Sequence, residues 1–205
     1  MSFLRWRRTR IPSDPHFRAN ASVETCSDNK FKVYPRALNI TWGNDRRYWT
    51  IPGRDPNNYD KDENYFAELK QVCWLEVTGS IKKDLVPGKT YKASFGVSLS
   101  PDAFGWDDCS VYIMAKIGKK GHFHLKKMNL TTIPTTSTDV KISFIPTPGD
   151  DLIVQVPLTQ PDDDLNLYFG LYEVWTNRWK GGLRIHYALV EMVIHNDTAI
   201  PITTQ

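Results

Sequence analysis

Cysteine is scarce in this sequence, and its spacing argues against two common kinds of site. The three cysteines, Cys26, Cys73 and Cys109, are an odd number separated by wide and unpatterned intervals. A disulfide framework needs an even set of cysteines, and a zinc site needs closely spaced pairs. We therefore expect neither a metal nor a cofactor. One exposed thiol that joins two chains stays open as an alternative.

Long apolar runs and a large excess of one charge are also missing. No segment approaches the length of a membrane-spanning helix, and arginines interrupt the first twenty residues, which argues against a secretory signal. The formal net charge is +3, and the first eighteen residues carry five arginines against a single aspartate, Asp14. The rest of the sequence is close to neutral and predicts no broad positively charged surface for nucleic acid. We expect a cytoplasmic protein without a membrane span.

The distribution of residue types predicts one domain with two flanking segments. A chain of 205 residues with 40% hydrophobic content can bury a substantial core. Residues 1–33 are rich in arginine, proline, serine and asparagine, without apolar periodicity, and are predicted to form a basic, flexible arm. Residues 34–196 then form the domain, and 197–205 a C-terminal tail.

The domain is predicted to be all-β. Its short segments alternate apolar and polar residues between proline, glycine and aspartate clusters, which is typical of antiparallel strands and turns. Many such strands favour a two-sheet antiparallel sandwich of the jelly-roll type. The predicted strands are Val72–Ile81, Lys89–Leu99, Ser110–Ile117, Phe123–Met128, Val140–Ile145, Leu152–Val156, Leu165–Val174 and Leu183–Ile194.

Two local patterns make the prediction more specific. Apolar residues recur at helical spacing within Asn64–Gln71, which predicts a single short helix. In the last predicted strand, strict alternation places Leu183, Ile185, Tyr187 and Leu189 on one face.

What the sequence has in abundance is tryptophan, with seven in 205 residues. Trp42 and Trp49 bracket a turn signal at Gly43, and a chain reversal there would set two aromatic rings side by side. In one register the two rings are Trp42 and Trp49, and in another Tyr48 takes the second place. Burial of both tryptophans in the core is the alternative.

Polar residues of the same turn complete a candidate site. Asn44, Asp45 and Arg47 lie between the two tryptophans in the sequence. A flat aromatic platform beside amide, carboxylate and guanidinium groups suits a pyranose, whose C–H face stacks on a ring while its hydroxyls form hydrogen bonds. We therefore predict a sugar-binding site here.

A second aromatic and charged cluster lies in the predicted loop before the last strand. Glu173 could accept hydrogen bonds from sugar hydroxyls, and Trp179 could wall the site. An ion pair of Glu173 with Arg178 or Lys180, with a packing role for Trp179, is the alternative.

Several of these motifs together resemble the phloem lectin family, the phloem protein 2 and Nictaba-related group, and most of all its cucurbit phloem lectins. The motifs are RALNITW at 36–42, RYW at 47–49, AEL at 67–69, VCWLEVTG at 72–79, GW at 105–106 and WKGGL at 179–183. The resemblance covers roughly residues 34–194, nearly the whole predicted domain.

The resemblance implies a nucleocytoplasmic, non-catalytic jelly-roll lectin of phloem sap. Such a lectin binds N-acetylglucosamine oligomers, including chitin oligosaccharides and the chitobiose core of N-glycans. The family's sugar-binding positions fall on Trp42, Trp49 and Glu173, while a second family glutamate falls on Asn166. We expect a homodimer whose partners are N-acetylglucosamine oligosaccharides and the N-glycans of glycoproteins. The full predicted site is Trp42, Asn44, Arg47, Tyr48, Trp49, Glu173 and Trp179.

Two other functions stay open, and a metal site is disfavoured. A jelly roll also carries glycoside hydrolases, in which paired carboxylates flank the scissile bond, but the sequence marks no second acid to pair with Glu173. The arginine-rich stretch 5–10 includes Trp6 and could contact RNA or a protein. His122 and His124 share one strand face but lack an identifiable third metal ligand.

Overall fold

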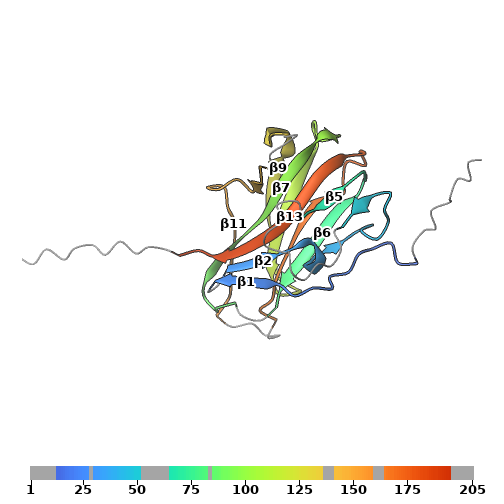
Figure 1. Ribbon diagram of the computed structural model, residues 1–205. Helices are drawn as coiled ribbons and strands as arrows, with labels where there is room; N and C mark the ends of the chain where they lie inside the picture. Colours follow the sequence, from blue (N-terminus) through green and yellow to red (C-terminus); the bar gives the residue numbers. More distant parts are fainter. Residues whose placement is uncertain are drawn as a thin grey trace, which may run out of the picture.

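The computed structural model describes residues 13–27, 30–51, 65–82, 85–135, 141–158 and 164–194. Two antiparallel β-sheets pack face to face, as Figure 1 shows, and the predicted all-β sandwich is confirmed. The first twelve residues of the predicted arm and the predicted tail 197–205 lie outside the described residues. In the described part of the chain, no helix has the length and apolar character that a membrane span requires.

The first sheet has five strands in the order β3-β6-β12-β8-β9. Its bounds are β3 (Asn39–Ile40), β6 (Leu75–Ile81), β12 (Leu167–Glu173), β8 (Ser110–Ile117) and β9 (His124–Asn129). Buried and partly exposed residues alternate strictly along β6 and β8, as expected for a sheet with one face in the core.

The second sheet has eight strands and is built around the long strands β7 (Thr90–Phe104) and β13 (Gly181–Met192). β10 and β11 pair with β7, while β2 and β5 pair with β13, and β1 and β4 extend these edges. The remaining bounds are β1 (Glu24–Ser27), β2 (Lys30–Val33), β4 (Trp49–Thr50), β5 (Ala67–Leu69), β10 (Ser143–Ile145) and β11 (Leu152–Gln155).

The helix predicted at Asn64–Gln71 is wrong. Ala67–Leu69 forms strand β5, which pairs with β4 on one side and β13 on the other, and Asn64 lies outside the described residues. Ala67 and Leu69 are buried while Glu68 between them reaches outward to Arg184, so the local period is two. In the described residues, the helical segments are two short 3-10 turns, Pro35–Ala37 and Leu130–Thr132.

The alternation predicted along the last strand stops halfway. Ile185 lies opposite Val97, but Tyr187 lies opposite Gly96, so His186 is an extra residue in a β-bulge. The bulge turns the later residues over: Ala188 and Val190 now point inward and Tyr187 outward. The buried His186 has a pKa lowered to about 4, mainly by burial and also by the charge of Arg184.

Part of the predicted arm lies against the domain. Phe31 and Val33 of β2 are core residues, and β2 pairs with β13 along the edge of the large sheet. Further toward the N-terminus, Phe17 forms an antiparallel bridge with Ile40. The polar composition of residues 13–33 conceals this attachment, because each short piece contributes only one or two apolar anchors.

Candidate functional site

The predicted aromatic turn is a crossing between the two sheets. Ile40 at its start belongs to β3, which pairs with β6 in the small sheet, whereas Trp49 at its end belongs to β4, which pairs with β5 in the large sheet. Consecutive backbone turns bridge the gap, with Gly43 N–H donating to Ile40 and Asp45 N–H to Trp42. No hairpin register applies to this segment, because its two ends lie in different sheets.

The crossing gives the two tryptophans opposite environments. Trp42 adopts a φ of 64°, a left-handed conformation that is rare for a bulky residue, and its side chain is 37% exposed. The Trp49 side chain lies between the sheets and is 1% exposed. The expectation that Trp49 faces solvent is therefore wrong, and Trp49 is a core residue.

Tyr48 takes the place beside Trp42, as the alternative register predicted, although by a different geometry. The Trp42 and Tyr48 rings meet edge to face with centroids 5.9 Å apart. Tyr48 also stacks on Trp179, with centroids 6.4 Å apart and 28° between the ring planes. Trp179 is 52% exposed. We call Trp42, Tyr48 and Trp179 the aromatic wall.

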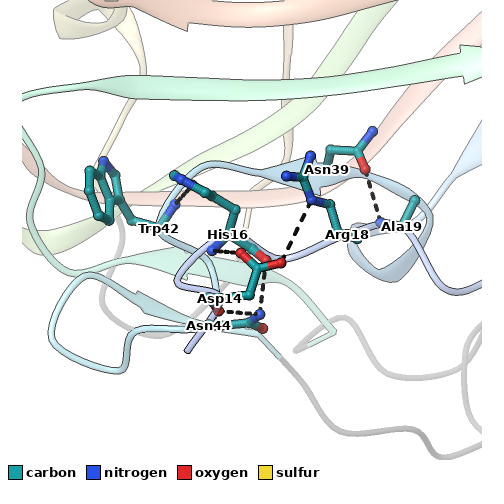
Figure 2. Close-up of polar contacts among 7 residues, drawn as sticks. All are labelled: Asp14, His16, Arg18, Ala19, Asn39, Trp42 and Asn44. Atoms are coloured by element: carbon teal, nitrogen blue, oxygen red, sulfur yellow. Dashed lines mark hydrogen bonds and ion pairs between the residues drawn. The ribbon is translucent and has the colours of Figure 1, made fainter. Parts of the chain in front are cut away.

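The N-terminal segment supports Trp42 of this wall, as Figure 2 shows. The backbone N–H of Trp42 donates to Nδ1 of His16 at 3.2 Å, and the two rings are 5.1 Å apart. The side-chain amide of Asn44 donates to the carbonyl oxygens of Asp14 and His16. Asn44, predicted as a binding residue, therefore anchors the segment that carries His16.

Arg47 fixes the turn from the other side. Its guanidinium forms a two-pronged ion pair with the buried carboxylate of Asp45, and it lies 5.3 Å from the centroid of Tyr48. Hydrogen bonds from the Arg47 side chain hold the pKa of Asp45 below its ordinary value despite the opposing effect of burial. Arg47 thus positions Tyr48, and the charge of Arg47 is already balanced by Asp45.

Glu173 is fully buried and forms an ion pair with the equally buried Lys180. Its other carboxylate oxygen accepts a hydrogen bond from the backbone N–H of Thr176. Burial acts to raise the pKa of Glu173, but the hydrogen bonds from Lys180 and Thr176 outweigh it, so the pKa is lowered. This is the ion pair named as the alternative for Glu173, and it closes the loop between β12 and β13.

Two glycines bring that loop against its neighbours. A Cβ on Gly105 would lie 2.1 Å from the carbonyl oxygen of Trp179, and one on Gly181 would lie 2.1 Å from that of Lys70. The Trp106 indole N–H donates to the Gly181 carbonyl oxygen at 2.8 Å. The sequence motifs at 105–106 and 179–183 therefore meet, and together they set the position of Trp179.

A cavity of about 780 Å³ opens beside the aromatic wall. Its lining includes residues in and just before strand β6, residues of the crossing, and residues of the N-terminal segment. Uncharged polar groups line it, together with Arg18 and Glu76, the latter accepting a hydrogen bond from the Trp74 indole at 2.9 Å. The lining includes Trp42, Tyr48 and Trp179 but neither Trp49 nor Glu173.

Sequence reasoning missed several residues of this cavity. His16, Phe17 and Arg18 come from the predicted arm, and Trp74 and Glu76 lie in the predicted strand Val72–Ile81, to which the sequence analysis assigns no binding residue. A usable signal was the alternation of β6, whose outward residues include Glu76 and Thr78.

The fold and the site together define a β-sandwich protein with an aromatic-walled surface cavity where the chain crosses between its sheets. Residues 28–191 match the family described as Phloem protein 2, and the chain belongs to this family.

Three relatives illustrate this membership. The Arabidopsis thaliana protein PHLOEM PROTEIN 2-LIKE A9 is 44% identical over 187 residues, which cover 87% of this chain and 96% of that protein. PHLOEM PROTEIN 2-LIKE A1 from the same plant is 31% identical over 80% of this chain and 61% of its own length. A Luffa acutangula protein named lectin is 38% identical over 40% of this chain and 39% of its own length.

Proposed function

We propose that this protein is a carbohydrate-binding lectin that recognises N-acetylglucosamine oligomers, including chitin oligosaccharides and the chitobiose core of N-glycans, in the cavity beside the aromatic wall. The observation that carries the proposal is the wall itself: three aromatic rings, with Tyr48 in contact with both Trp42 and Trp179, that line a cavity of about 780 Å³. The Luffa acutangula relative, which carries the name lectin, supports it.

The chemistry of the lining suits an uncharged sugar. The C–H face of a pyranose can lie against Trp42 or Trp179, because both indoles are apolar, flat and partly open to solvent. The acetamido group both donates and accepts hydrogen bonds, and Asn39, Thr41 and Thr78 of the lining offer amide and hydroxyl partners. Binding thus combines stacking with a few directed hydrogen bonds.

The same lining supports binding without catalysis. Hydrolysis of a glycosidic bond usually requires two carboxyl groups on opposite sides of that bond. Among the described residues that line the cavity, Glu76 is the sole carboxylate, and the indole of Trp74 holds one of its oxygens. Asp45 and Glu173 are buried in ion pairs outside the cavity.

The proposal extends to the setting in which the lectin works. The phloem proteins among the relatives favour a cytoplasmic location in phloem sap. Pairing of two chains into a homodimer would raise the effective affinity for multivalent glycans. The RNA or protein contact considered for residues 5–10 falls outside the described residues.

The test is titration calorimetry with chitotriose on the wild-type protein, Trp42→Ala and Trp179→Ala. The proposal expects the wild-type protein to bind and both variants to lose most of the affinity, with folded circular dichroism spectra. Retained affinity in both variants, or release of N-acetylglucosamine by the wild-type protein, would contradict it.

A further inference from the structure

The outward face of the small sheet carries a row of aromatic side chains that starts at the cavity. Glu76, which lines the cavity, is directly opposite Tyr172 on β12, and Tyr172 is directly opposite Tyr112 on β8. The ring of Trp175, from the loop after β12, packs edge to face on Tyr112 with centroids 4.7 Å apart. Neighbouring strands lie about 4.8 Å apart, so the row runs roughly 10 Å from the cavity rim.

The outward positions of a sandwich sheet are usually polar, because solvent covers that face. Here Tyr172 and Tyr112 lie partly exposed on the central strand β12 and its neighbour β8, and Trp175 is 57% exposed. Trp74, which is 46% exposed, marks the start of the row at the cavity rim. Large exposed apolar side chains that lie together usually mark an interaction site.

The Tyr172 ring of this row lies close against its own strand. A Cβ on Gly170 would meet atoms of the Tyr172 ring at 2.7 to 2.8 Å, so the ring lies over the sheet at Gly170. Any larger residue at 170 would push that ring away from the strand. The pKa of Tyr172 is raised to about 12 by burial and, secondarily, by the charge of Glu76, so its phenol stays neutral and can donate a hydrogen bond.

We propose that this row is an extended glycan subsite, and that a chain longer than the cavity continues over Glu76 onto Tyr172, Tyr112 and Trp175. The inference rests on the proposed function. The row would bind further units of the same uncharged oligosaccharide whose first units lie in the cavity. Continuity with the cavity favours this occupant over an unrelated one, because Trp74 and Glu76 belong to both surfaces.

The experiment compares chitotriose with chitohexaose by titration calorimetry on the full chain. The wild-type protein is expected to bind the hexaose more tightly than the trisaccharide. Tyr112→Ala and Trp175→Ala should each weaken hexaose binding roughly three- to tenfold and leave trisaccharide binding unchanged, since one aromatic contact contributes a factor of this size. Phe123→Ala, at an exposed ring near the other end of β8, is the matched control and should change neither value.

The possible failures can be told apart. Equal affinity of the wild-type protein for both lengths, or variants that weaken both equally, would overturn the extended subsite and leave the cavity intact. A shift of oligomeric state in Trp175→Ala during size-exclusion chromatography would overturn it in favour of an interface between copies. A wild-type protein that binds neither sugar would overturn the proposed function and this inference together.

Discussion

The rings of Tyr48 and Trp179 stack in the lining of the cavity, 6.4 Å apart and 28° from parallel, although 131 positions separate them in the chain. Tyr48 belongs to the crossing between the sheets, and Trp179 to the loop closed by Glu173 and Lys180. Each ring therefore depends on a separate set of supporting contacts, which mutations can change one at a time.

Removal of the Tyr48 ring should weaken sugar binding more than removal of its hydroxyl. Tyr48→Ala takes away the contact with both Trp42 and Trp179, whereas Tyr48→Phe keeps the stacking surface. We expect chitotriose affinity to fall about tenfold or more in Tyr48→Ala and to change little in Tyr48→Phe. Calorimetric titration measures both, and equal losses would show that the hydroxyl, rather than the ring, is recognised.

Trp49 should matter for stability rather than for sugar contact. Trp49→Ala leaves a large void between the sheets and should lower the free energy of unfolding by about 3–5 kcal/mol. Trp49→Phe should cost much less, since it refills most of the space and removes an indole N–H that has no hydrogen-bond partner among the described residues. Urea unfolding checks this, and Trp49→Ala at wild-type stability would refute it.

The backbone at Trp42 predicts an unusual result for glycine. Its φ of 64° costs a bulky residue roughly 1–2 kcal/mol relative to glycine. Trp42→Gly should therefore be more stable than Trp42→Ala by about 1 kcal/mol, while both lose chitotriose binding. Thermal unfolding of the two variants side by side tests this, and a less stable Trp42→Gly would show that the turn carries no strain.

The buried ion pair of Glu173 predicts a dependence on pH. Its folded pKa lies below the ordinary 4.5, so the unfolded chain binds more protons between these two values. The pair therefore contributes its full stability above about pH 4.5, and this contribution is lost as the pH falls through the lowered folded pKa. Glu173→Gln should show a flatter stability profile than the wild-type protein in that window.

Lys180→Met provides the companion measurement at neutral pH. It leaves a buried carboxylate without its partner and should cost about 3–5 kcal/mol. Combining it with Glu173→Gln should recover part of the loss, because the double variant buries no charge. Stability in Lys180→Met equal to the wild-type value would contradict the structural role assigned to the pair.

The approach of Gly105 to Trp179 predicts a loss of binding through position alone. Gly105→Ala places a methyl group 2.1 Å from the Trp179 carbonyl oxygen at a φ of 77°, so the loop has to move. Gly149→Ala is the control, because its φ of 98° is also in the region that disfavours side chains but nothing lies within 4 Å. We expect both to lose stability, about 1–3 kcal/mol each, and Gly105→Ala alone to lose sugar affinity. Unchanged sugar affinity in Gly105→Ala would show that the position of Trp179 does not matter for binding.

The sequence predicted the fold better than the site. Period-two alternation in the strands that became β6 and β8 indicates one buried face directly, because the pattern depends on the strand itself. The positions of Trp42 and Trp49 depend instead on their strands entering different sheets, which no local pattern encodes. The role of His16 could not be predicted for the same reason, because it depends on a contact with Trp42 that is distant in the sequence.

The most direct test is to follow the indole N–H signals of the tryptophans by ¹H–¹⁵N NMR during titration with chitotriose, with single Trp→Phe variants for assignment. The signals of Trp42 and Trp179 should shift with the sugar, while that of the buried Trp49 should stay in place. A shift confined to Trp49, or no shift at Trp42 and Trp179 when the sugar is bound, would contradict the account.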